Sequence, residues 1–344
     1  MPVTSAGARL ACLQLCLQLY KHAAQKPAIM RCGPTRRKTS AAARGLSFHS
    51  WHFLQTMDTD NHDQSGPEPA SKADWVRYRP TGVQGVTLMR AHFTDYTFER
   101  HSHPEFGIGL TYRGVQTFNC QGSRQVSAPG NVIFLNPDQA HDGLRGKTDS
   151  YDYSMLYVDP AVMTVLRERA AGVLPASYFR DAVVHAPEAA RQLHNAIEAT
   201  GQAQEALRAE SLLLKAFMGL LLRFGEAPGA AQAPALAGLA RLNRVRDYIR
   251  AHAGNDISIA DLAREAGVSR VYLSRAFERQ FGVPPHVYLN AVRLANARQL
   301  LLSGMSLATV AVSAGFADQS HFTRRFKGAV GLSPGAWLRQ MRSG

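Results

Sequence analysis

Two histidines separated by one residue, with a glutamate close behind, are the side chains of this sequence best suited to chemistry. Because side chains on a strand alternate between its faces, His101 and His103 would share one face, and Glu105 would extend it if Pro104 does not end the strand. Neutral imidazoles together with a carboxylate can bind Zn, Fe or Mn. The same groups can instead orient a polar ligand or form structural hydrogen bonds. On this pattern alone all three roles remain open.

A second set of polar side chains, near the other end of the chain, suits contact with base edges. Arg can donate two hydrogen bonds to guanine O6 and N7, and Gln can pair with adenine in the same way. In this sequence the candidate side chains lie beside apolar residues at four-residue spacing, Leu273 with Phe277 and Phe322 with Phe326. This spacing predicts helices with one buried face. The outward candidates are Arg270, Val271, Ser274 and Arg275 in the first helix and Gln319, Ser320, Thr323 and Arg324 in the second.

The elements that would position these side chains occur twice. An offset of 49 residues aligns Leu273, Phe277, Gly282 and Pro285 with Phe322, Phe326, Gly331 and Pro334. Further upstream the offset is 48, so the second copy carries one extra residue just after its glycine. Two copies are too few for a solenoid and indicate one duplicated supersecondary unit.

Each copy has the pattern of a helix-turn-helix. In the first copy, Ser258 and Asp261 predict a capping box for a helix running roughly from Ile259 to Ala266. Gly267 then permits a tight turn with positive φ, and Ser269 can cap the second helix. In the second copy Asp318 is the corresponding cap. A plain helical domain with solvated arginines is the alternative, and the duplication argues against it.

The second copy also carries a family resemblance. The run Ala314-Gly-Phe-Ala-Asp-Gln-Ser-His-Phe-Thr-Arg-Arg-Phe-Lys327, followed by Gly331-Leu-Ser-Pro334, resembles the signature of AraC/XylS-type transcriptional regulators. The linking pattern Arg293-Leu294, Ala297 and Leu300-Leu301 is similar to that family as well. The resemblance implies two helix-turn-helix units, joined by a long helix, that enter successive major-groove segments on one face of DNA.

The middle of the chain predicts a small β-domain. Between residues 85 and 160, short apolar runs alternate with turn residues at close intervals, as in a sandwich or a jelly-roll barrel. The runs Gly107–Tyr112, Val132–Leu135 and Tyr151–Val158 are strand-like. The interior of such a barrel can hold one small ligand. The pattern is similar to the cupin-like effector domain of the AraC/XylS family.

A cupin-like motif bears on the histidine pair. Pro129-Gly130-Asn131, with Pro137 and His141 beyond it, resembles the second cupin motif, whose histidine joins the His-x-His pair on a metal in cupin enzymes. Those enzymes place a glutamate several residues beyond the second histidine, where this chain has Gly107-Ile-Gly-Leu110. We therefore expect neither a metal site nor another cofactor. The candidate effector-binding residues are His101, His103, Glu105 and His141.

Charge is distributed unevenly along the chain of 344 residues, whose net charge is +13. Residues 236–344 hold 15 Lys or Arg against 6 Asp or Glu, whereas residues 57–235 hold 16 against 20. Basic charge thus coincides with the repeated unit, as contact with phosphates requires.

Residues 1–56 differ from the rest, with 8 Lys or Arg, no Asp or Glu and three of the four cysteines. Their apolar stretch from Leu10 to Tyr20 is too short to span a membrane. Three interpretations compete: a transit or secretory peptide, a disordered basic tail that assists DNA binding, and an upstream over-extension with Met57 as the natural start. We favour the over-extension because the charge changes so abruptly.

The expected organisation is as follows. Residues 57–84 form an N-terminal arm, residues 85–186 the cupin-like barrel and residues 187–224 a helical segment, which in the family mediates dimerisation. Residues 225–238, rich in Gly, Ala and Pro, form a linker. Residues 239–344 form the DNA-binding domain, with helix-turn-helix units at about 257–281 and 306–330 and a linking helix at about 285–303.

These patterns predict a two-domain, cytoplasmic transcriptional regulator, not an enzyme: an all-β cupin-like jelly-roll barrel with dimerisation helices precedes an all-α double helix-turn-helix. The expected partners are double-stranded DNA, a small-molecule effector, RNA polymerase and a second copy of the chain, with no membrane. Activation is the expected effect on transcription. The alternatives are a cupin-type metalloenzyme with an appended DNA-binding module and an architectural binder without sequence preference.

Overall fold

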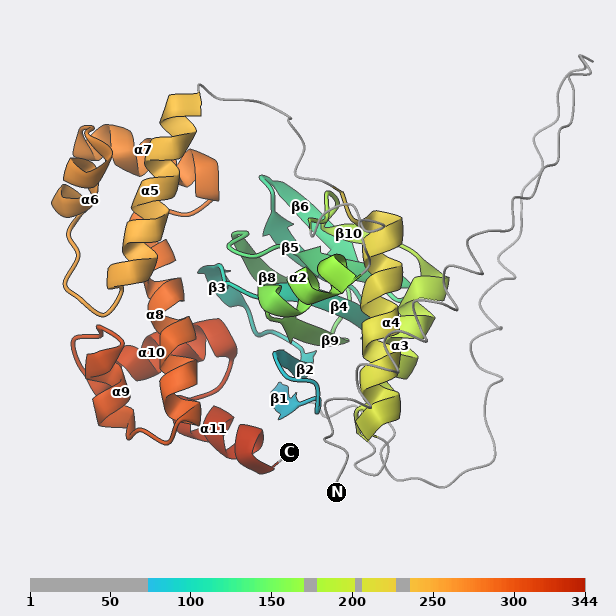
Figure 1. Ribbon diagram of the computed structural model, residues 1–344. Coiled ribbons are helices and arrows are strands. Elements are labelled where there is room, and N and C mark those ends of the chain that lie inside the picture. The colour runs from blue at the N-terminus through green and yellow to red at the C-terminus, as the bar shows by residue number, and fades with distance from the viewer. Residues whose placement is uncertain (1–73, 170–177, 202–205, 227–235, 344) are drawn as a thin grey trace, which may run out of the picture. The chain divides into compact units, whose positions relative to one another are not determined.

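The computed structural model describes residues 74–169, 178–201, 206–226 and 236–343 (Figure 1). The expectations for residues 1–56, for the arm up to residue 73 and for most of the linker therefore lie outside the described residues.

A six-stranded antiparallel sheet carries most of the N-terminal core, in the order β1-β2-β9-β4-β7-β10. Its strands are β1 (Trp75–Pro80), β2 (Val86–Phe93), β4 (Phe106–Arg113), β7 (Asn131–Leu135), β9 (Tyr151–Val158) and β10 (Val183–His185). In β1, residues assigned from the sequence to the arm pair with β2 along their whole length, from Trp75 opposite His92 to Pro80 opposite Thr87. The arm expectation is wrong for this stretch, because β2 begins only a few residues after β1 and folds back on it as an antiparallel hairpin.

A second, four-stranded sheet has the order β3-β8-β5-β6. Its strands are β3 (Phe98–His101), β5 (Gln116–Cys120), β6 (Ser123–Ser127) and β8 (His141–Arg145). Each described strand pairs only within its own sheet, so the two sheets form an open sandwich rather than a closed barrel. Aromatic and aliphatic side chains fill the space between them, among them Phe93, Phe118, Ile133, Tyr151 and Met155.

Three helices accompany the sheets: α2 (Pro160–Arg169) lies between β9 and β10 in the chain, and α3 (Pro187–Ala199) and α4 (Ala206–Phe224) follow β10. Asp159 caps α2 by accepting a hydrogen bond from the Ala161 amide at 2.8 Å. Figure 1 shows α3 and α4 against the six-stranded sheet, and Arg79 of β1 anchors α3 by donating to the Thr200 carbonyl at 2.7 Å. The two helices therefore cover the sheet face that points away from β3 and β8.

The C-terminal domain is entirely helical. It comprises α5 (Leu236–His252), α6 (Ile259–Ala266), α7 (Arg270–Phe281), α8 (Pro285–Leu302), α9 (Leu307–Ser313), α10 (Gln319–Val330) and α11 (Pro334–Ser343). The pairs α6/α7 and α9/α10 are the two helix-turn-helix units. The predicted capping box is present on α6, where the Ser258 side chain accepts from the Asp261 amide, and Gly267 ends the helix with φ +63°.

Helix α8 links two separate apolar clusters. Its first turns contribute Tyr288 and Leu289 to the cluster around Leu273 and Phe277 of the first unit. Its later turns contribute Ala297 and Leu301 to the cluster around Phe322 and Phe326 of the second. Each fully buried Leu or Phe contributes roughly 1.5–3 kcal/mol. A displacement of α8 would therefore move both units.

Candidate DNA interface and ligand cavities

The recognition helix of the first unit, α7, separates a buried face from an exposed one. Leu273 and Phe277 are fully buried, whereas Val271 and Tyr272 are 63% and 58% exposed. The predicted base-reading residues Arg270, Val271 and Arg275 are exposed, and Ser274 is partly exposed. Tyr272 joins this surface although it was not predicted, and its phenol can contact a phosphate. The signal that could have identified Tyr272 was its position between the helix cap Ser269 and the buried Leu273.

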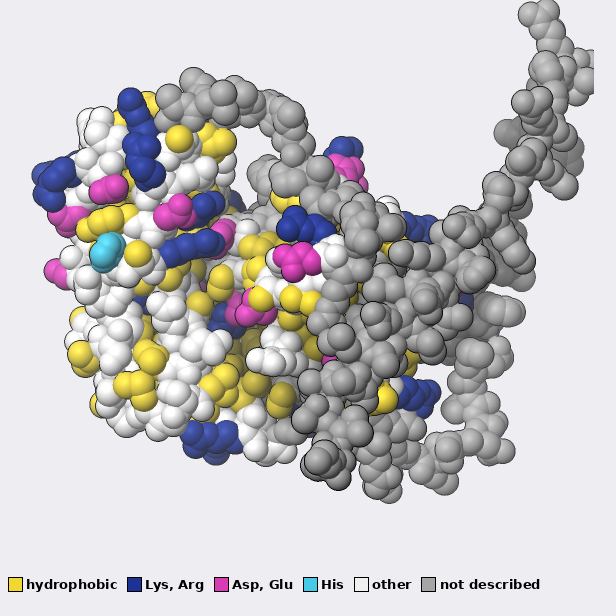
Figure 2. Space-filling model, viewed as in Figure 1, with side chains coloured by type: hydrophobic (Ala, Val, Ile, Leu, Met, Phe, Trp, Pro, Cys, Tyr) yellow, Lys and Arg dark blue, Asp and Glu magenta, His cyan; other side chains and the backbone are white. Residues whose placement is uncertain are grey.

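The second recognition helix, α10, repeats this arrangement. Asp318 caps it by accepting from the His321 amide at 2.7 Å, and this hydrogen bond helps to hold the pKa of the Asp318 carboxyl below its usual value. Phe322 and Phe326 are buried. The predicted readers Gln319, Ser320 and Arg324 are exposed and Thr323 is partly exposed. In the view of Figure 2, basic side chains lie among acidic ones over α5–α7.

The three predicted histidines lie together between the sheets and the helical domain. His101 ends β3 and pairs with His141 at the start of β8, and His103 follows two residues on. Their ring centroids are 4.5 Å apart for His101 and His141, 4.9 Å for His103 and His141, and 6.2 Å for His101 and His103. Sequence reasoning thus brought together residues that are 40 positions apart.

Backbone carbonyls determine which nitrogen of each of the three rings carries the proton. The Nδ1 atoms of His101, His103 and His141 lie 2.6–2.8 Å from the carbonyl oxygens of Glu99, Glu105 and Gln139. A carbonyl oxygen can only accept, so each Nδ1 carries the proton and each Nε2 keeps a lone pair. Burial lowers the pKa of all three rings, that of His103 to about 4. All three imidazoles are therefore neutral at pH 7.

Glu105 does not continue the strand face of the histidines as the sequence suggested, although its carboxylate lies 3.8 Å from His103 Nδ1. Strand β3 ends at His101, so the pattern of alternating faces is broken before Glu105. Its carboxylate accepts from Arg298 of α8 at 2.7 Å, and the two side chains are only 21% and 16% exposed. Burial raises the pKa of Glu105, but the Arg298 guanidinium, His103 and hydrogen bonds together outweigh burial and hold that pKa below its usual value. The pair fastens the sandwich to the linking helix.

Further contacts fasten the sandwich to both helix-turn-helix units. Asp138, in the loop before β8, pairs with Arg250 of α5 and accepts from the Tyr288 hydroxyl at 3.1 Å. Arg100 donates to the Gly282 carbonyl at the end of α7. Tyr78 donates to the Val330 carbonyl at the end of α10 at 3.0 Å. These docking contacts leave the predicted base-reading faces of α7 and α10 exposed.

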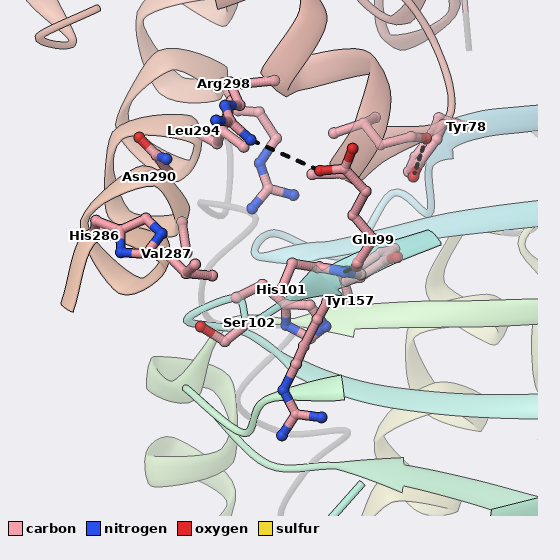
Figure 3. Close-up of a pocket in the computed structure, with 16 residues that line it drawn as sticks. Tyr78, Glu99, His101, Ser102, Tyr157, His286, Val287, Asn290, Leu294 and Arg298 are labelled. Carbon is pink, nitrogen blue, oxygen red and sulfur yellow. Dashed lines mark hydrogen bonds and ion pairs between the residues drawn. The ribbon is translucent and has the colours of Figure 1, made fainter. Parts of the chain in front are cut away.

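Two cavities meet at the histidines. One, of about 40 Å³, lies between the sheets and is lined by Tyr151, Tyr153 and Phe118, together with His101 and His141. The other, of about 120 Å³, lies between β3 and α8 (Figure 3). His101 and Tyr157 line both cavities and form the wall between them.

Within the described part of the chain, no three His, Cys, Asp or Glu side chains are arranged to hold a metal ion. In the same residues, no helix is both long enough and apolar enough to cross a membrane.

A sandwich with internal cavities, joined to two helix-turn-helix units with exposed polar faces on their second helices, defines a ligand-responsive DNA-binding regulator. Residues 83–221 match the family model for the AraC-like ligand binding domain, and residues 262–340 match a helix-turn-helix domain. The chain belongs to the AraC family of transcriptional regulators, as its sequence signature predicted.

Known relatives agree with this assignment. The chain is 29% identical over 261 residues to the arabinose operon regulatory protein of Escherichia coli, covering 73% of this chain and 87% of that protein. It is 27% identical over 226 residues to the transcriptional regulator YbfI of Bacillus subtilis, covering 65% and 81%. The structure of ToxT K231A from Vibrio cholerae shares the fold, with a TM-score of 0.52 at 14% identity over 75% of this chain and 98% of that one. These comparisons confirm an effector-controlled, DNA-binding regulator and give no support to the alternative of a metalloenzyme.

Proposed function

We propose that α7 and α10 read an asymmetric operator in two successive major-groove segments, and that effector binding at the histidines changes how the sandwich holds these helices. The observation that carries the proposal is the division of both helices into a fully buried apolar face and an exposed face bearing Arg, Gln and Ser. The reading residues are Arg270, Val271, Ser274, Arg275, Gln319, Ser320, Thr323 and Arg324.

Regulation acts through the docking contacts. The sandwich holds α8 through Glu105 and Arg298, and it holds the ends of α7 and α10 through Arg100 and Tyr78. A ligand shifts this arrangement only by its differential affinity for the docked and released states. His101, His103 and His141 line the cavities and orient the effector, while Glu105 acts through Arg298. The cluster binds rather than catalyses, because Arg298 already engages the nearby carboxylate.

The proposed assembly is a homodimer that works in the cytoplasm. Helix α4 exposes Leu207 at 55% and leaves Leu212, Leu214 and Leu222 partly exposed, which suits packing against a second copy in a homodimer. A regulator of this type works in the cytoplasm and, as an activator, contacts RNA polymerase.

The test is selection of bound DNA from a random pool by the full chain. We expect an enriched site with two different motifs about one helical turn apart, since the two recognition helices carry different side chains. Binding without an enriched motif would contradict the proposal and favour an architectural binder.

A further inference from the structure

The cavity between β3 and α8 has a buried polar wall. Figure 3 shows Ser102 and His101 opposite His286, Val287 and Asn290 of α8. Ser102 and His103 both line the cavity and are only 4% and 7% exposed. Ser102 Oγ and His103 Nε2 have no hydrogen-bond partner among the described residues. An unpartnered buried polar atom costs roughly 1–3 kcal/mol, so this wall is suited to a polar ligand group.

The nature of these two atoms selects the ligand group. His103 Nε2 can only accept a hydrogen bond, because its Nδ1 carries the proton, whereas the Ser102 hydroxyl can donate or accept. One hydroxyl group on a ligand satisfies both, since it donates to the imidazole and accepts from the serine. A carboxylate cannot donate to His103 Nε2.

The arginines around the cavity are already engaged. Arg298 binds Glu105, Arg100 donates to the Gly282 carbonyl, and Arg325 lies 3.8 Å from the Glu99 carboxylate. The remaining lining includes apolar side chains of α8 and α10, among them Leu294 and Val330. The cavity thus offers a neutral polar end and an apolar body.

We propose that this cavity binds a small uncharged alcohol or phenol, with its hydroxyl on Ser102 and His103 and its apolar body against α8. This inference rests on the proposed function, because it names the ligand class of an effector-controlled regulator. A ligand held there contacts β3 on one side and α8 on the other, between the two helix-turn-helix units. Its occupancy therefore bears directly on the docking of the linking helix.

The test compares benzyl alcohol with benzoate, which share a ring but differ in charge, by calorimetric titration of the full chain. We expect saturable binding of benzyl alcohol that is tighter than that of benzoate. Ser102→Ala and His103→Phe should each raise its Kd about tenfold, as the loss of one hydrogen bond implies. Gln116→Ala is the matched control, because Gln116 lines only the cavity between the sheets, and it should leave the Kd unchanged.

Tighter binding of benzoate, or no binding of either probe, would overturn the inference. So would a Kd that rises in Gln116→Ala but not in Ser102→Ala, because the ligand would then occupy the other cavity. Selection of DNA by the same unliganded preparation separates the two proposals. An enriched motif without alcohol binding would remove only this inference, whereas the absence of a motif would remove the proposed function itself.

Discussion

At the residue scale, the histidine cluster shows how backbone groups determine side-chain chemistry. Each Nδ1 proton is fixed by a carbonyl two residues away along the chain, so the three Nε2 lone pairs remain available. The arrangement also keeps the cluster neutral, because a proton on one ring would be repelled by any proton on the next. We expect two consequences that depend on single side chains.

The first concerns pH. The unfolded chain protonates His103 below about pH 6.5, whereas the folded protein resists protonation until about pH 4. The stability contributed by neutral His103 is therefore fully present above pH 6.5 and is lost as the pH falls toward 4. One proton gives a slope of about 1.4 kcal/mol per pH unit in this window. Urea unfolding between pH 7 and pH 4 should show a shallower slope for His103→Asn than for the parent protein. Equal slopes in the two proteins would contradict the expectation.

The second concerns base reading. Arg324→Ala should lose about 1–3 kcal/mol of discrimination between the selected operator and random DNA, because a bidentate contact to guanine carries sequence information. Fluorescence anisotropy on both DNAs measures this difference. Arg339→Ala, an exposed arginine on α11, is the control and should change both affinities alike. A uniform loss for Arg324→Ala would show that this arginine contacts only phosphate.

At the element scale, local signals determine where the recognition helices begin. The Ser269 side chain accepts from the Tyr272 amide, and Asp318 performs the same role for α10. Both caps lie directly before the first residue proposed to read bases in their helix. A frayed first turn would therefore displace the side chains proposed to read DNA.

Loss of the cap on α7 should lower stability. We expect Ser269→Ala to reduce the free energy of unfolding by about 1 kcal/mol, since one amide at the start of the helix loses its partner. Ser269→Asn retains a capping oxygen and should remain close to the parent protein. Urea unfolding of the three proteins provides the measurement, and an equal loss in both variants would point away from capping.

The contrast between signals from residues near in sequence and contacts between distant residues explains which features the sequence could predict. The ends of α6, α7 and α10 depend on neighbours three or four residues away, so Ser258, Gly267 and Asp318 mark them directly. The pairing of β1 with β2 and the open edge of the sandwich depend on register between strands, which composition does not encode. The ion pair between Glu105 and Arg298 joins residues 193 positions apart, and neither residue type points to the other.

At the scale of the whole described unit, a few polar contacts connect the sandwich to the helical domain. The most buried ion pair among them joins Glu105 to Arg298, next to the histidine cavity. Removal of one partner from a buried pair leaves the other charge without compensation, which is far more costly than removal of both.

This asymmetry can be measured. Arg298→Met should reduce the free energy of unfolding by about 3–5 kcal/mol, and the double variant Glu105→Gln/Arg298→Met should recover a large part of that loss. The exposed pair of Arg246 and Asp247 is the control, where Arg246→Ala should cost less than about 1 kcal/mol. A double variant whose loss equals the sum of the single losses would show that the two residues do not interact.

The docking contacts also have a genetic consequence. The faces of α7 and α10 proposed to read bases are exposed, whereas Arg100, Tyr78 and Glu105 contact other parts of the helical domain. Substitutions can therefore alter DNA binding and docking separately. Alleles altered in the recognition helices should lose promoter occupancy. Alleles altered in the docking contacts should keep occupancy but uncouple expression from inducer, so suppressors of a non-inducible allele should map to β3 and α8 even though neither touches the promoter.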